Sequence, residues 1–360
     1  MGVSSNLFKA KVLVAGVASA CALPALAQLP PEIQIYGRVN VSIEHITVDN
    51  SSNTALLPNE SNKELVDNSS RIGIRGKKEL TPGLAAIFQV ESRVKLDDSA
   101  GSVFASRDSF AGLQGGFGTI RAGRTIGPVY YATYDYISNH NHDTGTSSDA
   151  LLAGTVVGNQ GFMNNTLWYT SPKFGPFSVD VAYSLLAETR TPGLDQPSHL
   201  GLVGAYDQGP LHLAASYATT ENTTDLDPGA GVKGDKGTAI TVGGLYDFKS
   251  FVIGALYEKA TSDLLVGDVD RDYFRIAAMM PVGQHEFHLN YGWVDSDAGN
   301  AGAKQYTLAY NYNITKQTKV YAFYTVVDNE SAGTFGFRQS TPAVAGADFK
   351  SFALGFRHNF

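Results

Sequence analysis

The sequence has little cysteine, few charged residues and no excess of basic residues. It has 1 Cys among 360 residues, and charged residues make up 17% of the chain. A single Cys cannot form an intramolecular disulfide, so the fold is not stapled by disulfide bonds. A net charge of -7 argues against a protein that binds nucleic acid through its phosphates.

Long apolar runs are also scarce. A helical membrane protein needs several apolar stretches of about 20 residues, and a chain with 43% hydrophobic residues is too polar for such a bundle. The 18 Tyr, 19 Phe and 2 Trp, together with a modest net charge, argue against a disordered chain. The 38 Gly with few Met indicate turns and strands.

The amino end has the pattern of an export signal. Lys9 and Lys11 precede the apolar stretch 12–27, which ends in Ala25-Leu26-Ala27, a small-x-small motif that a signal peptidase cleaves. We therefore expect residues 1–27 to be a cleaved signal peptide.

A lipoprotein anchored through Cys21 is the alternative for this segment, but Ala18 stands where Leu is usual. Cleavage after Ala27 leaves a mature chain of residues 28–360, which we expect to form a single domain. This chain carries no thiol, and the loss of two lysines changes the net charge to -9.

Period-two alternation recurs along the mature chain and predicts strands with two different faces. It returns over residues 177–185 and 305–313. It is clearest in the first strand, whose apolar face holds Ile33, Ile35, Val39, Val41 and Ile43, and whose polar face holds Gln34, Tyr36, Arg38, Asn40, Ser42 and Glu44.

The connectors between these strands alternate in length. Seven are short and turn-like, centred on 81–83, 114–116, 174–176, 208–210, 248–250, 282–284 and 315–317. Eight are long and polar, over about 48–66, 97–103, 124–160, 188–197, 221–236, 261–270, 296–303 and 329–347. Fifteen connectors imply 16 strands, with both termini on one side.

Two environments suit such strands. A soluble sandwich of 16 strands would need two domains and a linker, and no linker composition is present. A closed barrel in a bilayer turns its apolar face to lipid and its polar face to water, with short turns on one side and long loops on the other. The sequence therefore predicts an all-β fold, a 16-stranded antiparallel transmembrane β-barrel.

Several motifs, in order along the whole mature chain, resemble those of one family. They are Ile35-Tyr36-Gly37-Arg38, the stretches 70–76, 83–91 and 117–124, Tyr169-Thr170-Ser171-Pro172, and the closing 355–360. The chain resembles a general bacterial porin, most similar to those of beta-proteobacteria. The resemblance implies a homotrimer of barrels in the outer membrane, in contact with lipid and lipopolysaccharide, each with a water-filled pore narrowed by a long inward-folded third loop.

Charged side chains that line a pore select the ions that cross it. Strand parity points Arg38, Arg71, Arg75, Arg93 and Arg107 inward from neighbouring strands, and we expect them to form a basic wall. In the family that the chain resembles, the positions of Arg38, Arg71 and Arg107 carry the basic ladder of the constriction. The alternative is that these arginines pair with Glu44, Glu79 and Glu91 and only stiffen the lumen.

The third long connector, 124–160, is too long for an ordinary hairpin tip. Its acids Asp135, Asp143 and Asp149 are candidates to face the basic wall, and four tyrosines between 130 and 136 could line the opening. The Pro-Glu-Phe type motif common in this loop of the family is absent. Trp168 also stands where relatives often carry another Arg.

The last strand alternates Phe352, Leu354 and Phe356 towards a terminal Phe360. A terminal aromatic resembles the signal that the barrel-assembly machinery reads, and it also suits a strand that closes on the first. We expect a channel through which small ions and hydrophilic solutes diffuse passively.

We expect a mild anion preference, because charges at the neck act at short range while those at the mouth are screened within about 8 Å. A saturable, substrate-specific channel, a barrel enzyme and a soluble secreted β protein are the alternatives.

No cofactor, metal or catalytic site is predicted. His140-Asn141-His142-Asp143 lacks the three or four ligands of a defined metal site. His285 and His288 match a zinc-protease pattern in letters only, because residues three apart on a strand point to opposite faces. His212 and Ser216 share an inward face, but no third catalytic partner has a recognisable motif.

Overall fold

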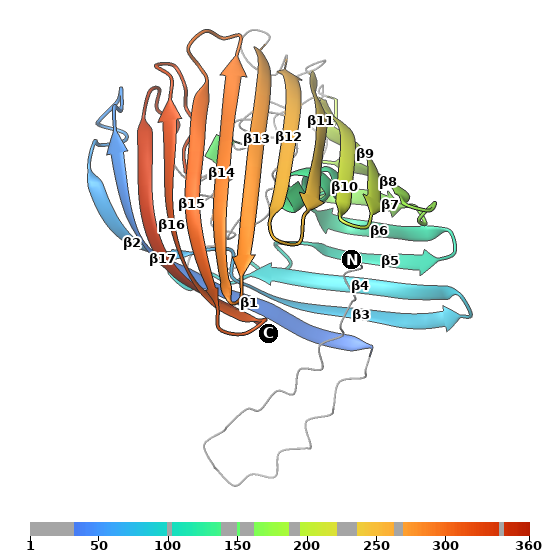
Figure 1. The fold of residues 1–360 in the computed structure, drawn as a ribbon. Coiled ribbons are helices and arrows are strands. Elements are labelled where there is room, and N and C mark those ends of the chain that lie inside the picture. Colours follow the sequence, from blue (N-terminus) through green and yellow to red (C-terminus); the bar gives the residue numbers. More distant parts are fainter. Residues whose placement is uncertain are drawn as a thin grey trace.

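The computed structural model describes residues 32–98, 103–137, 150–151, 162–186, 195–221, 236–262, 269–337 and 342–360. Its strands form one antiparallel sheet that closes on itself (Figure 1). The elements are β1 (Ile33–Asp49), β2 (Ser61–Asp67), β3 (Arg71–Thr81), β4 (Leu84–Arg93), β5 (Ser109–Gly115), β6 (Gly118–Thr125), the short π-helical segment η1 (Tyr130–Asp135), β7 (Met163–Thr170), β8 (Phe177–Leu185), β9 (Ser198–Gln208), β10 (Leu211–Glu221), β11 (Lys236–Asp247), β12 (Val252–Ser262), β13 (Val269–Val282), β14 (His285–Ser296), β15 (Ala303–Asn313), β16 (Thr318–Asn329) and β17 (Asp348–Asn359).

β2 and β3 are two halves of one barrel strand. Both pair with β1, which meets β2 along residues 41–47 and β3 along residues 33–38. Between them Ser69 has a left-handed backbone, with φ of 62°. The Asn40 amide donates to Ser70 Oγ at 2.9 Å, and Asn40 Nδ2 donates to the Asn68 carbonyl at 2.9 Å. Because the break stays bonded to β1, the barrel has sixteen strands, and the predicted strand number is confirmed.

The ends of the chain meet where the barrel closes. β1 pairs with β17 from Arg38 and Asn359 to Asp49 and Asp348. The Gly37 amide donates to the Phe360 carbonyl at 3.0 Å, and the Phe360 amide donates to the Gly37 carbonyl at 3.1 Å. All seven predicted short connectors are turns at the barrel end that also holds these termini. Full closure leaves the sheet without a free edge at this seam.

In this barrel apolar side chains are exposed and polar side chains are buried, the reverse of a soluble protein. On β1, Ile43 is 64% exposed while its polar neighbour Ser42 is 2% exposed, and Asn40 and Glu44 are buried. β15 repeats the pattern, with Leu308 exposed and Thr307 buried. Apolar side chains therefore face outward and polar side chains face the lumen, as a bilayer requires.

No helix in the described segments is long and apolar enough to cross a membrane.

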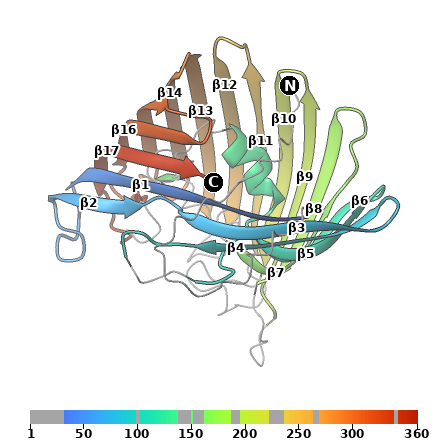
Figure 2. The same cartoon turned by 90° about the horizontal axis from the view of Figure 1, so that it is seen from below.

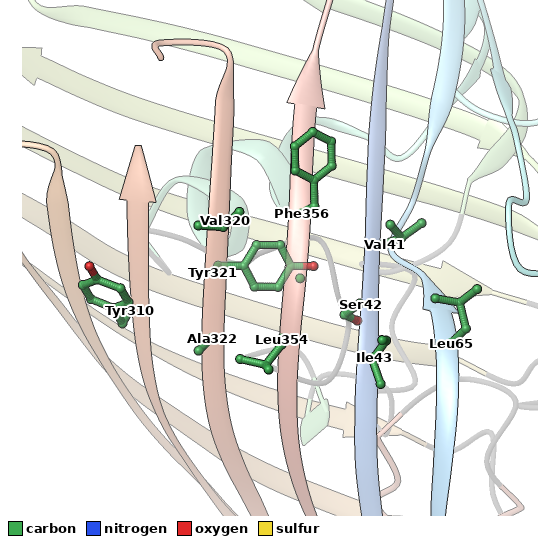
Figure 3. Close-up of a pocket in the computed structure, with 11 residues that line it drawn as sticks. Val41, Ser42, Ile43, Leu65, Tyr310, Val320, Tyr321, Ala322, Leu354 and Phe356 are labelled. Atoms are coloured by element: carbon green, nitrogen blue, oxygen red, sulfur yellow. The ribbon is translucent and has the colours of Figure 1, made fainter. Parts of the chain in front are cut away.

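An apolar groove crosses the outer surface near the seam (Figure 3). Its floor is Gly355 of β17. Its walls come from β1, β2 and β15–β17, through Val41, Ile43, Leu65, Tyr310, Val320, Leu354 and Phe356. The groove passes over the backbone of Gly355 and the small outward side chain of Ala322, between larger outward side chains.

Behind Gly355, the ring of Tyr321 lies across β17. An added Cβ at Gly355 would lie 2.1 Å from Tyr321 Cζ, so only glycine fits beneath the ring. The Tyr321 hydroxyl donates to Asn40 Oδ1 at 2.9 Å and accepts from Asn68 Nδ2 at 3.1 Å. This contact ties β16 to β1 and to the break between β2 and β3.

Candidate pore-lining site

Three of the predicted arginines gather on one wall of the lumen. Arg38 of β1 lies opposite Arg71 of β3 in the strand register, and Arg107 lies two residues before β5. Electrostatic interactions link Arg38 with both Arg71 and Arg107. The Nε of Arg38 is held by Asn359 Oδ1 at 2.9 Å. Alternation along the strands and the pairing of β3 with β1 therefore bring Arg38, Arg71 and Arg107 together on the inner face of the barrel.

Glu91 of β4 lies within this wall. Its Oε1 is 3.8 Å from Arg71 Nη1 and accepts a hydrogen bond from Arg107 Nε, while its Oε2 accepts from the Tyr36 hydroxyl at 2.8 Å. The side chains of Arg71 and Arg107 are both 15% exposed. Arg71 and Arg107 therefore share one carboxylate, which leaves an excess of positive charge.

The wall extends to the other side of β1, where the sequence analysis placed no site residue. Arg357 of β17 pairs in register with Asn40 of β1 and with Lys319 of β16. Arg357 acts electrostatically on Arg38 and Arg71, and Lys319 interacts with both Arg357 and Arg38. The alternation of residues along β17 could have revealed Arg357. Leu354 and Phe356 face outward, and Arg357 therefore faces inward.

Arg75 and Arg93 occupy other positions on the lumen wall. Arg75 is exposed nearer the turn end, where its Nε donates to Gln34 Oε1 at 3.1 Å and its guanidinium lies 4.9 Å from the Tyr36 ring centre. Arg93 ends β4 opposite Arg71, and its backbone amide donates to Ser106 Oγ at 3.0 Å.

Opposite the wall lies the described part of the third long connector. Figure 2 shows η1 inside the ring of strands, beside β10 and β11. Asp135 ends η1 with an exposed side chain, and its carboxylate interacts electrostatically with Arg38 and Arg357. Asp143 and Asp149 lie outside the described residues. The described acid and the basic wall thus place opposite charges across the lumen.

Apolar packing fixes η1 and its flanks against the inner face of the barrel. Val129 packs with small and branched residues of β9–β12, and Ile137 lies against Gly243 and Gly254. An added Cβ at Gly254 would lie 2.4 Å from the Ile137 carbonyl oxygen. Glycines on β11 and β12 therefore make the room in which this segment sits.

Tyrosine hydroxyls of η1 bind carboxylates of the barrel. Tyr134 donates to Glu258 of β12, which also accepts from Thr241 Oγ1 at 2.7 Å. Tyr131 donates to Asp108 and stacks on Trp168, with ring centres 6.3 Å apart. Burial, with the adjacent carboxylate, raises the pKa of both tyrosines, so they stay neutral donors at physiological pH.

Trp168 is itself paired with an arginine. The guanidinium of Arg121 lies 3.5 Å from the Trp168 ring centre, a close cation–π contact. Arg121 Nη2 also donates to Thr170 Oγ1 at 2.8 Å, and Trp168 Nε1 donates to Asp180 Oδ1 at 2.8 Å. This cation is thus stacked on the Trp168 ring and held by Thr170.

Metal ligands do not cluster in the described segments: no group of three or more His, Cys, Asp or Glu residues meets there. His140 and His142 lie outside them. On β14, His285 is exposed and contacts Tyr310, while His288 is buried beside Glu286 and Asn311. The two histidines point to opposite faces, as their spacing on a strand predicts.

His212 has an acid partner that sequence reasoning did not find. Its Nδ1 lies 2.7 Å from Asp207 Oδ1, but its Nε2 lies 2.9 Å from the carbonyl of Ala132 in η1. Ser216 is four residues further along β10, about 13 Å away at the rise of a strand. The imidazole therefore contacts the third connector instead of activating a serine.

We predict that Glu91→Gln increases chloride over potassium permeability about threefold to fivefold. A full charge about 4 Å from a permeating ion contributes about 1 kcal/mol in water, and Glu91 is the carboxylate that Arg71 and Arg107 share. Reversal potentials in a potassium chloride gradient measure this ratio. Glu79→Gln, an exposed residue of β3, is the matched control and should leave it unchanged. An unchanged ratio in Glu91→Gln would contradict the prediction.

Comparisons with known proteins match this architecture. A family model described as Gram-negative porin matches residues 13–333. Outer membrane porin protein 32 of Delftia acidovorans is 28% identical over 362 residues, covering 97% of this chain and 99% of the relative. A monosaccharide porin of a Halomonas species is 23% identical over 84% of this chain and 89% of its own.

Solved structures agree in fold. The anion-selective porin from Comamonas acidovorans has a TM-score of 0.75 and 26% identity, covering 91% of this chain and 99% of its own. The trimer form of OmpT from Vibrio cholerae has a TM-score of 0.66 and 17% identity, with the same coverage, and shows the fold alone. The predicted resemblance to general bacterial porins is confirmed. The chain belongs to the Gram-negative porin family and is a multi-pass channel protein of the outer membrane.

Proposed function

We propose that this porin is a passive channel for small hydrophilic solutes and ions with a mild preference for anions. The observation that supports the preference is the wall of five cations, Lys319, Arg357, Arg38, Arg71 and Arg107, which interacts with the carboxylates of Glu91, Glu286 and Asp135. The cations outnumber the carboxylates where the charges interact. Charges that line a pore select by sign over a few ångströms.

One relative of known structure supports the same sign. The porin from Comamonas acidovorans is described as anion-selective, and it shares 26% identity with this chain. Against this stands the acidic mature chain, with its net charge of -9. Mouth charges are screened within about 8 Å at physiological salt, so we assign selectivity to the wall.

We propose that the third connector narrows the pore and that Asp135 is the acid facing the wall at this neck. Its interaction with Arg38 and Arg357 supports this role. Asp143 and Asp149 stay candidates for the same function. Opposite charges across a narrow opening produce a transverse field that orders water and polar solutes.

The hydrogen bonds of the lumenal tyrosines and of His212 favour a passive pore over a saturable channel or a barrel enzyme. The hydroxyls of Tyr131 and Tyr134, which a saturable site would use, are bound to Asp108 and Glu258. His212, which a barrel enzyme would use, is bound at both ring nitrogens. We therefore propose a channel without a chemical step and without a cofactor.

Planar-bilayer recording of the detergent-purified protein tests the function. A chloride-selective reversal potential in a potassium chloride gradient is expected, with conductance that does not saturate as solute rises. A potassium-selective potential would overturn the assignment to the wall. Absence of any conductance from folded protein would overturn the open channel.

We propose a homotrimer in contact with lipid and lipopolysaccharide. A trimer form is described for OmpT of Vibrio cholerae, which has the same fold. The groove over Gly355 at the barrel seam, lined by Leu65, Leu354 and Phe356, is the surface that we assign to a second copy of this chain. Conductance steps in groups of three support this assembly, and single steps throughout would contradict it.

We propose that residues 1–27 are removed on export and that Phe360 is read by the barrel-assembly machinery. Phe360→Ala is expected to lower the amount of folded protein in the outer membrane several-fold while refolding in detergent stays normal. Alanine keeps both backbone bonds to Gly37, so closure itself is preserved. Heat-modifiable gel mobility of outer-membrane fractions measures the folded amount.

Phe352→Ala is the control, because Phe352 is an exposed aromatic of β17 that does not line the groove assigned to a second copy. Equal yields of the Phe360 variant and the wild type would show that assembly does not depend on the terminal ring.

A further inference from the structure

His212 is a buried histidine that links the barrel wall to the third connector. It lies on the inner face of β10 and is 5% exposed. Its Nδ1 is 2.7 Å from Asp207 Oδ1 of β9, and its Nε2 is 2.9 Å from the carbonyl oxygen of Ala132 in η1. One side chain thus contacts two segments that the barrel fold alone does not hold together.

Both partners of the ring can only accept hydrogen bonds. A neutral imidazole has one N–H and one lone pair, so it can satisfy one acceptor and must turn a lone pair to the other. The imidazolium has two N–H groups and satisfies both. The observed arrangement is therefore complete only when His212 is protonated.

The groups around the ring favour that charged form. β9 contributes the Asp207 carboxylate, whose other oxygen lies 3.7 Å from Lys173 Nζ of the β7–β8 turn. η1 contributes the ring of Tyr136, centred 4.1 Å from the imidazole. On β11 the residue opposite His212 is the uncharged Leu245. The carboxylate is the group in direct hydrogen-bond contact with the ring that carries a full charge.

We infer that protonated His212 is a positioning residue of the pore, which fixes η1 by donating to the Ala132 carbonyl while Asp207 holds its other nitrogen. This inference rests on the proposed function of the third connector as the neck. Ala132 precedes Asp135 by three residues, about one helical turn, so the bond sets the position of the acid that faces Arg38 and Arg357. Loss of the proton from Nε2 releases that bond, because the Asp207 carboxylate is the stronger acceptor and keeps the remaining proton on Nδ1.

The channel therefore senses pH. While both ring nitrogens of His212 carry a proton, η1 is fixed, and once Nε2 loses its proton one hydrogen bond from a charged donor is lost. Loss of such a bond lowers the ratio of time in the main conductance level to time in neighbouring levels by about tenfold.

Single-channel recording of the full protein in planar bilayers, stepped from pH 5 to 8.5 in potassium chloride, tests the inference. The wild type should show the tenfold change in dwell-time ratio as one transition. Asp207→Asn gives Nδ1 an amide that can donate to it, so a neutral ring keeps its proton on Nε2 and its bond to Ala132, and this variant should lose the transition. A flat wild-type profile would overturn the inference.

His212→Gln separates positioning from packing. Its amide can donate to Ala132, but its oxygen then faces the Asp207 carboxylate, so the main level should be unstable at every pH. Combining His212→Gln with Asp207→Asn restores a donor towards each acceptor without a titratable group. The double variant should recover the stable main level and keep it from pH 5 to 8.5. Failure of the double variant to recover it, or a pH transition that persists in it, would also overturn the inference.

His199→Gln is the matched control. His199 is a buried histidine of the adjacent strand β9, and its Nδ1 lies 3.0 Å from Thr220 Oγ1 on β10. This variant should keep the wild-type transition, and loss of the transition would assign the pH response to His199 instead. A wild type that forms no channel would contradict the proposed function, whereas a channel with unaltered pH response in His212→Gln would contradict only the role of His212.

Discussion

Replacing both Arg38 and Arg357 by glutamate is expected to turn the channel from chloride-selective to potassium-selective. Both arginines interact electrostatically with Asp135, and they interact with each other across the β1–β17 seam. A unit charge about 4 Å from a permeating ion contributes about 1 kcal/mol in water, favourable for one sign of ion and unfavourable for the other. Even Arg38→Gln with Arg357→Gln should lower the chloride to potassium permeability ratio by about tenfold or more.

Reversal potentials in a potassium chloride gradient measure this change, at low and at high salt. The effect should shrink at about 1 M salt, where the Debye length is near 3 Å. Arg75→Gln is the control, since Arg75 is exposed near the turn end and is held by Gln34 and Tyr36. If the double glutamate variant keeps the wild-type sign of potential, the wall does not set selectivity.

The second large effect is expected from Gly355→Ala, which should destabilise the folded barrel by about 2–4 kcal/mol. The new Cβ would lie 2.1 Å from Tyr321 Cζ, so the ring must move. Overpacking alone costs about 1–3 kcal/mol, and displacement of the ring also breaks the bonds of its hydroxyl to Asn40 and Asn68, each contributing about 1 kcal/mol. Urea unfolding in lipid vesicles, followed by tryptophan fluorescence, measures the loss.

Two further variants make this test specific. Gly204→Ala on β9 meets no atom within 4 Å and should change the free energy of unfolding by less than about 0.5 kcal/mol. In a Tyr321→Ala background, adding Gly355→Ala should cost little, because the obstructing ring is gone. Equal stability of Gly355→Ala and wild type would show that the seam does not depend on this contact.

The sequence pattern was enough to predict the barrel. Alternation in β1 assigned Ile43 to the outside and Ser42 to the inside, and the structure has them so. Connector lengths predicted sixteen strands and that both termini lie on one side of the barrel. Both signals are local, because parity depends only on the next residue and turn composition on a few residues.

Candidate pore residues were only partly predictable. Alternation tells which side chains face the lumen but not where they lie along the barrel axis. It therefore could not show that Arg38 and Arg71 belong to the basic wall while Arg75 lies nearer the turn end. Arg357 was missed because the predicted wall residues with which it interacts, Arg38 and Arg71, are more than 280 residues away in sequence, across the seam. The shared carboxylate of Glu91, and the place of Asp135 opposite the wall, also depend on contacts between different strands.

By itself, the sequence determined the strands, their two faces, their number and the family resemblance, because these follow from periodicity and motifs within short stretches. Tertiary structure alone decided which charges meet, how η1 is held by Tyr134 and His212, and why Gly355 stands beneath Tyr321. The physical reason is barrel closure. It brings the first and last strands side by side and turns a one-dimensional pattern into a ring with opposing walls.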